Sequence, residues 1–195
     1  MRDEFTALIL CGGRSSRMGR DKTLLPAGNG TFLSRAVAFW QPLCSAVLLA
    51  SGSDSHFDET PDAVPQLPDR YPGCGPLAGL HAGLCAAQTP YLLISAVDMP
   101  FLTADAVLPL MQGVQGHDAC VYLKDGRPEP LLGAYRCAGC LPVTESLLDA
   151  GQLRMAALLQ KLDTVYLQTD TPEIFSNINT PDAYARFRQQ LEVQA

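Results

Sequence analysis

Near-continuous apolar runs cover residues 5–10, 46–50 and 91–97. Runs without alternation are typical of strands that are covered on both faces, as in a parallel sheet. A weaker run at 63–69 is interrupted by prolines, which favours a place at a sheet edge. The pattern therefore predicts a buried, mostly parallel sheet in the first half of the chain.

Helical spacing fills the intervals between these runs. Thr31 can cap a helix over 32–43, a Gly/Pro turn at 71–76 opens into an apolar helix ending near Gln88, and Thr103 can cap a third helix. The alternation predicts an α/β fold, a three-layer, Rossmann-like open sheet that is mostly parallel and has helices on both faces. The length fits a single domain over residues 1–195.

The second half of the chain is less regular. We expect strands at 119–123 and 131–135 around a polar turn at 124–130, helices at 140–149 and 155–162, and a strand at 164–168. A last helix is expected to start at Thr180-Pro181, because proline suits the first helical turn.

A glycine-rich, basic loop follows the first predicted strand. It runs from Gly12-Gly13 through three arginines, among them Arg17, to Lys22. Glycines let backbone N–H groups approach an anion, and arginine and lysine pair with phosphate oxygens. The spacing matches neither the Walker pattern, which needs adjacent Gly and Lys, nor the dinucleotide pattern G-x-G-x-x-G. We expect the loop to cradle phosphates; the alternative is a glycine-rich turn with solvated arginines.

Two aspartates are expected at the same edge of the sheet, because ligands of open α/β sheets bind outside the carboxyl ends of the strands. Asp98 ends the apolar run at 91–97, where a carboxylate needs water, a partner or a metal. Opposite a phosphate loop we expect Mg²⁺ at Asp98, with a local capping role as the alternative. Asp69 could face the same edge or be an ordinary turn residue. Together these parts predict nucleotide binding and phosphoryl or nucleotidyl transfer.

Composition narrows the classes of partner. Hydrophobic residues make up 47% of the chain, and 20 acidic against 14 basic residues leave a net charge of −6. Nucleic acid and anionic membrane surfaces need a positive field, so we expect neither as a partner, and the basic loop suits a compact anionic ligand. No apolar run approaches ~20 residues and the N-terminus lacks a secretory signal, which favours the cytoplasm.

The seven cysteines are expected to be reduced thiols in that compartment. Cys137 and Cys140 form a lone C-x-x-C, which is weak as a zinc site, and thiols at a helix start are the simpler interpretation. The three histidines, His56, His81 and His117, stand near no recognisable nucleophile motif, and we interpret them as structural or surface residues.

Several motifs occur together and in order between Leu8 and Tyr184. They are Leu10-Cys11-Gly12-Gly13, Arg17-Met18-Gly19, Asp21-Lys22, Pro68-Asp69, Gly75-Pro76-Leu77-Ala78-Gly79, Asp98-Met99-Pro100-Phe101 and Asn177-Ile178-Asn179-Thr180-Pro181. This set resembles nucleotidyltransferases of the glycosyltransferase-A-like fold and, among them, the molybdenum cofactor guanylyltransferases, a MobA-like family. The resemblance covers nearly the whole chain.

The resemblance implies that GMP passes from GTP to the terminal phosphate of molybdopterin, with release of pyrophosphate. It implies that the backbone of Leu10, Cys11, Gly12 and Gly13 holds the nucleotide. Arg17 and Lys22 would neutralise its phosphates, and Asp98 would bind Mg²⁺, so that these three residues carry catalysis.

For the rest of the substrates, the resemblance implies that Asp69 helps to hold the guanosine. Gly75 and Gly79 would let the second glycine loop approach a substrate closely, and Asn177 and Asn179 would receive the pterin. The expected partners are GTP and molybdopterin, with other cofactor-assembly proteins and molybdoenzyme or tungstoenzyme chaperones as further candidates.

Two departures from the family pattern keep alternatives open. Cys11 stands where the family commonly has Ala, and Ala50-Ser51-Gly52-Ser53 stands where it often has an Asn that contacts the base. Gly12 and Gly75-Pro76-Leu77 favour GTP over CTP. The alternatives are a CTP-dependent molybdopterin cytidylyltransferase, another small-molecule nucleotidyltransferase, and a non-catalytic nucleotide- or cofactor-binding protein.

Overall fold

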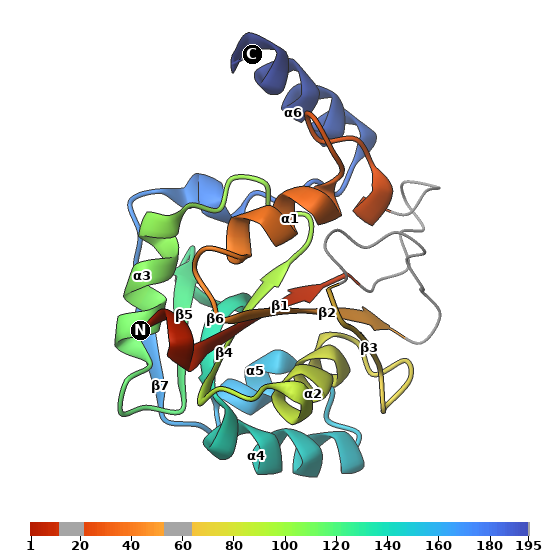
Figure 1. Cartoon of the computed structure of the whole chain (residues 1–195). Helices are drawn as coiled ribbons and strands as arrows, with labels where there is room; N and C mark the ends of the chain where they lie inside the picture. Colours follow the sequence, from red (N-terminus) through yellow and green to blue (C-terminus); the bar gives the residue numbers. More distant parts are fainter. Residues whose placement is uncertain (12–21, 53–63, 195) are drawn as a thin grey trace.

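The computed structural model describes residues 1–11, 22–52 and 64–194 (Figure 1). Within these residues seven strands form one sheet in the order β3-β2-β1-β4-β6-β5-β7. Their bounds are β1 Phe5–Leu10, β2 Ala46–Gly52, β3 Gln66–Pro68, β4 Tyr91–Ala96, β5 Ala119–Lys124, β6 Arg127–Arg136 and β7 Thr164–Leu167.

The pairing of the strands is mostly parallel. β1 pairs in parallel with both β2 and β4, so Leu10 lies opposite Ala50 on one side and Ala96 on the other. The β2–β3 and β5–β7 pairs are also parallel, and β6 runs antiparallel to β4 and β5. β3 lies at an edge. These observations confirm the predicted open, mostly parallel sheet with a proline-interrupted edge strand.

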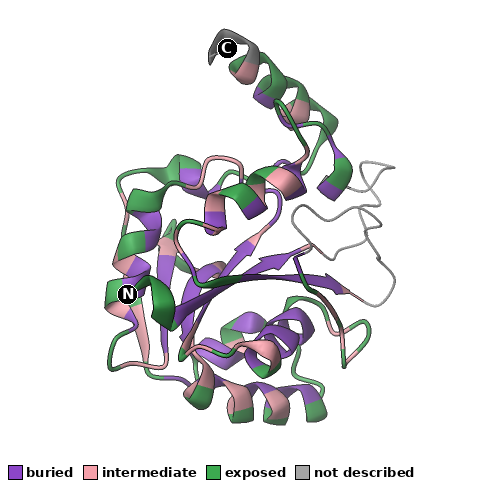
Figure 2. Cartoon of the chain, in the orientation of Figure 1, coloured by how far each residue is buried: buried purple, intermediate pink, exposed green. Residues whose placement is uncertain are grey.

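Helices cover both faces of the sheet, as predicted. On one face lie α1 (Phe32–Trp40), α3 (Ala104–Gly113) and α6 (Pro181–Gln194); on the other lie α2 (Pro76–Ala86), α4 (Cys137–Asp149) and α5 (Met155–Leu159) (Figure 1). Each face has its own core, because side chains alternate along a strand. Accordingly, Phe5, Ala7 and Ile9 of β1 enter one core, and Leu8 and Leu10 enter the other. Figure 2 shows the central strands β1, β2 and β4 mostly buried and the outer helix faces exposed.

Local capping fixes where two of the helices begin. The Thr31 side chain accepts a hydrogen bond from the Ser34 N–H (3.1 Å), and that of Thr103 accepts one from the Ala106 N–H (3.3 Å). Such caps satisfy backbone donors that the first helical turn leaves free. Both caps were predicted from the sequence, and both are confirmed.

The structure corrects the prediction for the β5–β6 hairpin. Residues 127–130, expected in a turn, belong to β6, and the turn is only Asp125-Gly126. Both turn residues have positive φ angles, 51° and 74°, as in the type I′ turns that suit two-residue hairpins. Pro128 and Pro130 lie in the part of β6 beyond its pairing with β4, where a strand tolerates a missing N–H.

Three helix boundaries also differ from expectation. α1 ends at Trp40 rather than at residue 43. α4 begins at Cys137 rather than at residue 140, and α5 ends at Leu159 rather than at residue 162. Short 3₁₀ helices cover Arg2–Glu4 (η1), Lys22–Leu24 (η2) and Pro172–Phe175 (η4). In the described part of the chain, no helix combines the length and apolar character needed to cross a membrane.

Candidate active site

The carboxyl ends of β1 and β4 meet at one edge of the sheet. After β1 the chain first builds β2 and β3 on one side and then returns to place β4 on the other. Open α/β sheets bind ligands at such a reversal of strand order. Backbone bonds hold the edge together: the Val97 N–H donates to the Leu10 carbonyl (3.1 Å), and the Cys11 N–H donates to the Ala50 carbonyl (2.9 Å).

Asp98 follows β4 at this edge and is 8% exposed. Its position directly after the Val97–Leu10 bond places it beside the end of β1, which leads into the glycine-rich loop. A carboxylate so far removed from water needs polar or cationic partners, and Asp98 does take part in further interactions within the chain. Its hard oxygen donors are of the kind that Mg²⁺ prefers, so Asp98 fits the metal-ligand role that the sequence predicts.

The segment from Asn177 to Asn179 docks onto Asp98. The Ile178 N–H donates to the Asp98 carbonyl oxygen (3.1 Å), and the Ile178 side chain is buried, whereas both asparagines are exposed. The structure therefore brings Asn177 and Asn179 to the same edge as Asp98, although about 80 residues separate them in the sequence.

A cavity of about 520 Å³ opens beside the two asparagines. It is lined by Phe101, Lys124, Phe175, Ser176, Asn177, Ile178, Asn179, Ala183, Arg186, Phe187 and Gln190. The Lys124 ammonium donates to the Phe175 carbonyl (3.4 Å) and lies 5.9 Å from the centre of the Phe175 ring. Two cations, three side-chain amides and aromatic rings in one hollow suit a planar molecule that carries negative charge.

Lys124 and Arg186 were missed from the sequence. Lys124 ends β5 and Arg186 lies on α6, so only the folded chain brings them together. Tyr184 and Phe187 hold α6 in place: the Tyr184 hydroxyl donates to the Pro26 carbonyl (2.9 Å), and Phe187 stacks on Phe32 with ring centres 5.2 Å apart.

Asp69 follows β3, two strands from β1 on the side away from β4. Its side chain is partly buried, and burial raises the pKa of its carboxyl group. Asp69 and Asp98 thus both follow strands of the parallel part of the sheet, at the same edge.

The two glycines predicted to bind substrate occupy different settings. Gly75 is the residue before α2 and has a φ angle of +66°, a conformation that other residues adopt only with strain. Gly79 lies within α2, and a Cβ there would lie 2.9 Å from Leu10 Cδ2 and 3.2 Å from Ala50 Cβ. Gly79 therefore lets α2 pack tightly against the ends of β1 and β2, and its substrate role stays a prediction.

The remaining predicted residues fall in or beside the undescribed segment. Leu10 and Cys11 are described, with Leu10 buried and Cys11 partly buried. Gly12, Gly13 and Arg17 lie outside the described residues. Lys22 is the first residue of η2.

Among the residues that the structure describes, Cys137 and Cys140 belong to no group of potential metal ligands. Cys137 and Cys140 sit at the start of α4, which confirms the simpler interpretation. The Cys140 thiol is buried and donates to the Asp118 carbonyl (3.2 Å), and burial raises its pKa to about 12. The Cys140 thiol is thus used for a hydrogen bond within the fold.

A second polar cluster, also missed from the sequence, joins α2 to α4. His81 Nε2 lies 3.3 Å from Glu145 Oε1 and 3.5 Å from Cys85 Sγ. Burial and the Glu145 carboxylate raise the pKa of the Cys85 thiol. The H-x-x-x-C spacing on a predicted helix was the available signal, because residues four apart share one helix face.

Solved structures place the fold in a known class. The chain superposes on the molybdopterin-guanine dinucleotide biosynthesis protein A from Archaeoglobus fulgidus with a TM-score of 0.80 and 24% identity, covering 96% of this chain and 99% of that one. For the 2-C-methyl-D-erythritol 4-phosphate cytidylyltransferase from Thermus thermophilus the TM-score is 0.69, at 18% identity and 94% and 97% coverage. The fold is that of these two structures.

Sequence comparison narrows that class. Residues 7–165 match the MobA-like NTP transferase domain. A probable molybdenum cofactor guanylyltransferase from Carboxydothermus hydrogenoformans is 31% identical over 188 residues, 93% of each chain. The molybdenum cofactor guanylyltransferase from Rhodobacter capsulatus is 33% identical over 193 residues, 96% of this chain and 97% of that one. The chain belongs to the MobA-like NTP transferase family, as the sequence motifs predicted.

Proposed function

We propose that this chain transfers GMP from GTP to the terminal phosphate of molybdopterin, forming molybdopterin guanine dinucleotide and pyrophosphate. One observation carries the proposal: Asp98 lies where β1 and β4 end together, with the Asn177–Asn179 segment bonded to its backbone. A single edge of the sheet thus offers a carboxylate beside the end of β1, which the glycine-rich loop follows in the sequence, and a hollow for a second substrate. The names of the two relatives support the base and the acceptor.

The transfer is a displacement at phosphorus. An oxygen of the molybdopterin phosphate attacks the α-phosphorus of GTP and forms the new P–O bond. The bond from that phosphorus to the bridging oxygen breaks, and its electron pair leaves with pyrophosphate. The nucleophile is already an anion at neutral pH, so positioning and charge neutralisation are the main tasks of the protein.

The donor nucleotide is assigned to the loop after β1. The backbone of Leu10, Cys11, Gly12 and Gly13 would approach the nucleotide, and glycines permit that approach. Arg17 and Lys22 would neutralise the phosphates, whose charge increases on the leaving pyrophosphate. Asp69, held partly desolvated after β3, would hydrogen-bond the guanosine.

Mg²⁺ is the cation that we assign to Asp98. When bound there, it would neutralise phosphate charge, which eases attack by one anion on another. The acceptor is assigned to the cavity beside Asn177 and Asn179, where amides suit the hydrogen-bonding edges of a pterin and Lys124 suits its phosphate. We place the reaction in the cytoplasm, where cofactor-assembly proteins would supply molybdopterin and receive the product.

A nucleotide panel tests the proposal. Purified protein is incubated with Mg²⁺, molybdopterin and one of GTP, CTP, ATP or UTP, and pyrophosphate release is followed. We expect release with GTP alone, dependent on molybdopterin. Release with CTP and none with GTP would identify a cytidylyltransferase and contradict the proposal. Nucleotide binding without pyrophosphate release from any of the four would identify a non-catalytic binding protein.

A Lys22→Ala variant extends the panel to the phosphate loop. Loss of one cation from the phosphates is expected to lower kcat/KM about 10²-fold. Lys161→Ala, which removes an exposed lysine beyond α5, is the matched control and should retain full activity.

A further inference from the structure

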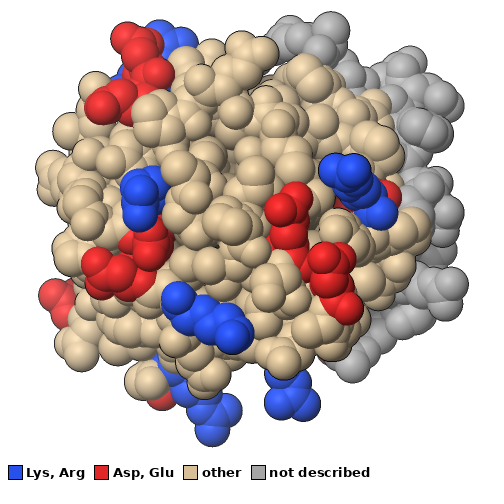
Figure 3. Space-filling view, turned by 90° about the horizontal axis from the view of Figure 1, so that it is seen from below, with Lys and Arg blue, Asp and Glu red and all other residues tan. Residues whose placement is uncertain are grey.

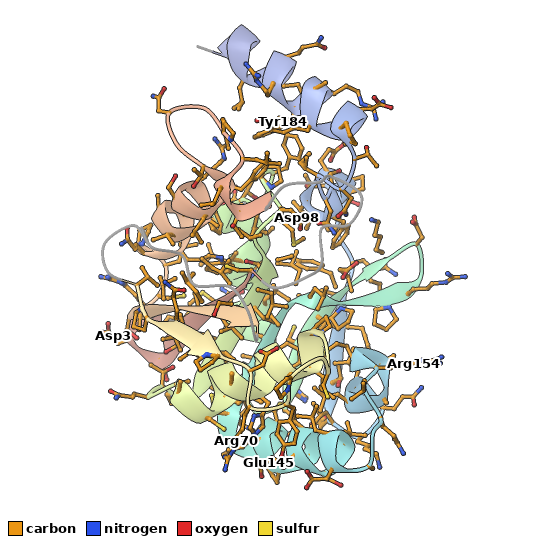
Figure 4. All side chains as sticks on the ribbon, turned by 90° about the vertical axis from the view of Figure 1, so that its right-hand side faces the viewer. Asp3, Arg70, Asp98, Glu145, Arg154 and Tyr184 are labelled. Carbon is orange, nitrogen blue, oxygen red and sulfur yellow. The ribbon has the colours of Figure 1, made fainter. Side chains whose placement is uncertain are left out.

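A second group of potential metal ligands lies on the helical layer that contains α2 and α4. His81 and Cys85 are one turn apart on α2, and Glu145 reaches them from α4. Their three donor atoms, Nε2, Sγ and a carboxylate oxygen, all lie within 4.8 Å of one another. Figure 4 shows Glu145 at the lower end of the molecule, far from Asp98, so this cluster is separate from the candidate active site.

The spacing of these atoms matches a tetrahedral metal site. With Zn–N and Zn–O bonds of about 2.1 Å and a Zn–S bond of about 2.3 Å, tetrahedral angles put N and O about 3.4 Å apart and N and S about 3.6 Å apart. The structure has 3.3 Å from His81 Nε2 to Glu145 Oε1 and 3.5 Å from Nε2 to Cys85 Sγ. The third distance, from Cys85 Sγ to the Glu145 carboxylate oxygen, is within 4.8 Å. The Glu145 side chain is 44% exposed and has the freedom to shorten this distance.

The packing around His81 fixes the position of its imidazole ring. His81 is 1% exposed, and the Tyr71 ring meets it edge-on with ring centres 5.1 Å apart. Tyr71 is itself tied to α4, because its hydroxyl donates to Asp149 Oδ1 (3.2 Å). His81 Nδ1 is buried and has no partner among the described residues, and Nε2 is the ring nitrogen that lies beside Glu145 and Cys85.

The donors also select the metal. One nitrogen, one sulfur and one oxygen suit Zn²⁺, whereas Mg²⁺ takes oxygen ligands almost alone. A thiolate and a carboxylate balance the charge of a dication, so little net charge is buried. Seen from the side of α4, Lys and Arg are interspersed with Asp and Glu, and this face carries no large field of one sign that would gather cations by itself (Figure 3).

We propose that His81, Cys85 and Glu145 form a zinc site that joins α2 to α4, with a water molecule in the fourth position. The exposed side of Cys85 provides the entry path for the ion and the water. α2 begins directly after Gly75 and packs on Leu10 and Ala50 through Gly79, next to the candidate active site. A zinc ion that binds α2 to α4 therefore stabilises the helix against which the ends of β1 and β2 rest.

Metal titration of the chelator-stripped full chain tests this site. Zn²⁺ is titrated in competition with a chromophoric chelator, and Co²⁺ is added separately as a spectroscopic probe. We expect one Zn²⁺ per chain, a raised melting temperature, and a thiolate-to-cobalt charge-transfer band with the strong visible bands of tetrahedral cobalt. Absence of stoichiometric Zn²⁺ binding overturns the proposal.

Variants at the two accessible ligands assign the ion to the cluster. Cys85→Ser and Glu145→Gln are expected to weaken Zn²⁺ binding at least about tenfold, and Cys85→Ser to abolish the charge-transfer band. Cys74→Ser and Glu173→Gln are the matched controls and should bind Zn²⁺ as the parent does.

Asp98→Asn distinguishes the cluster from the candidate active site. An unchanged Zn²⁺ affinity supports the cluster, and a lost affinity places the ion at the candidate active site and overturns the proposal. Circular dichroism melts establish that each variant is folded.

Discussion

The two halves of the sheet differ in both strand direction and chemistry. β3, β2, β1 and β4 are all parallel, and Leu10, Asp69 and Asp98 stand at or directly after their carboxyl ends. β6, β5 and β7 are mixed, and their contribution to the site is Lys124 at the end of a hairpin strand. The first half carries the residues assigned to the donor nucleotide, and the second borders the cavity assigned to the acceptor.

This difference shows how one sheet can serve two anionic substrates. Parallel strands place all their carboxyl ends at one edge, which suits a phosphate-binding loop with a nearby carboxylate. The antiparallel pair of β5 and β6 continues beyond the end of β4, as far as Lys124 and Arg127. Lys124 on β5 therefore reaches the segment that contains Asn177 and Asn179. The Ile178–Asp98 backbone bond joins the two halves. Variants in each half should therefore affect different substrates.

The largest effect is expected for Asp98→Asn, which acts at the junction of the two halves. Loss of the negative charge removes the predicted cation ligand, so kcat should fall about 10³-fold while the amide preserves the fold. Pyrophosphate release measures the rate, and Asp170→Asn, an exposed loop variant, is the control. Activity within about threefold of the parent would remove Asp98 from catalysis.

Gly79→Ala is expected to damage the donor half through packing. The added Cβ meets Leu10 and Ala50, and overpacking of this kind costs roughly 1–3 kcal/mol of unfolding free energy. Gly83→Ala, one turn further along α2, meets Leu8 and Leu92 instead and serves as the control. Urea unfolding should show both variants destabilised, but only Gly79→Ala should also raise the KM for GTP. An equal change of KM in both variants would contradict the local account.

Lys124→Gln is expected to act on the acceptor half alone. Removal of one exposed cation from the cavity should raise the KM for molybdopterin about tenfold and leave the KM for GTP unchanged. Steady-state kinetics with each substrate varied in turn give both values, with Lys161→Gln as the control. A parallel rise of both KM values would mean that the two halves are not separate sites.

Asp69→Asn should give the smallest effect, and one that depends on pH. Burial raises the pKa of the Asp69 carboxyl above its ordinary value of 3.8, so the folded state holds the proton to higher pH than the unfolded state does. The parent therefore loses stability as pH rises through this window, and the variant does not. Urea unfolding from about pH 4 to 7 should show Asp69→Asn gaining relative to the parent as pH rises. A constant difference between the two would refute the desolvation argument.

The parallel half of the fold was the predictable half. Strands buried on both faces read as unbroken apolar runs, so β1, β2 and β4 were found nearly to the residue, and Thr31 and Thr103 marked two helix starts. The hairpin was mispredicted because residues 124–130 were interpreted as one polar turn, although a strand tolerates Pro128 and Pro130 there. Their tolerance depends on where β4 ends, which local sequence does not encode.

The candidate site divides in the same way. Motifs that lie at strand ends, such as Asp98 and Asp69, could be placed at the sheet edge from topology alone. Lys124 and Arg186 could not, because they meet only through the packing of α6. His81 and Glu145 are 64 residues apart, and no local pattern reports that α2 and α4 pack together.

Calorimetric titration of the two substrates into the same set of variants tests the division of the site most directly. GTP with Mg²⁺ and molybdopterin are each titrated into the parent, Lys22→Ala and Asn179→Ala. We predict that GTP binds more tightly than CTP, that Lys22→Ala weakens GTP binding with molybdopterin binding unchanged, and that Asn179→Ala does the reverse. Loss of both affinities in either variant, or tighter binding of CTP, would contradict the account.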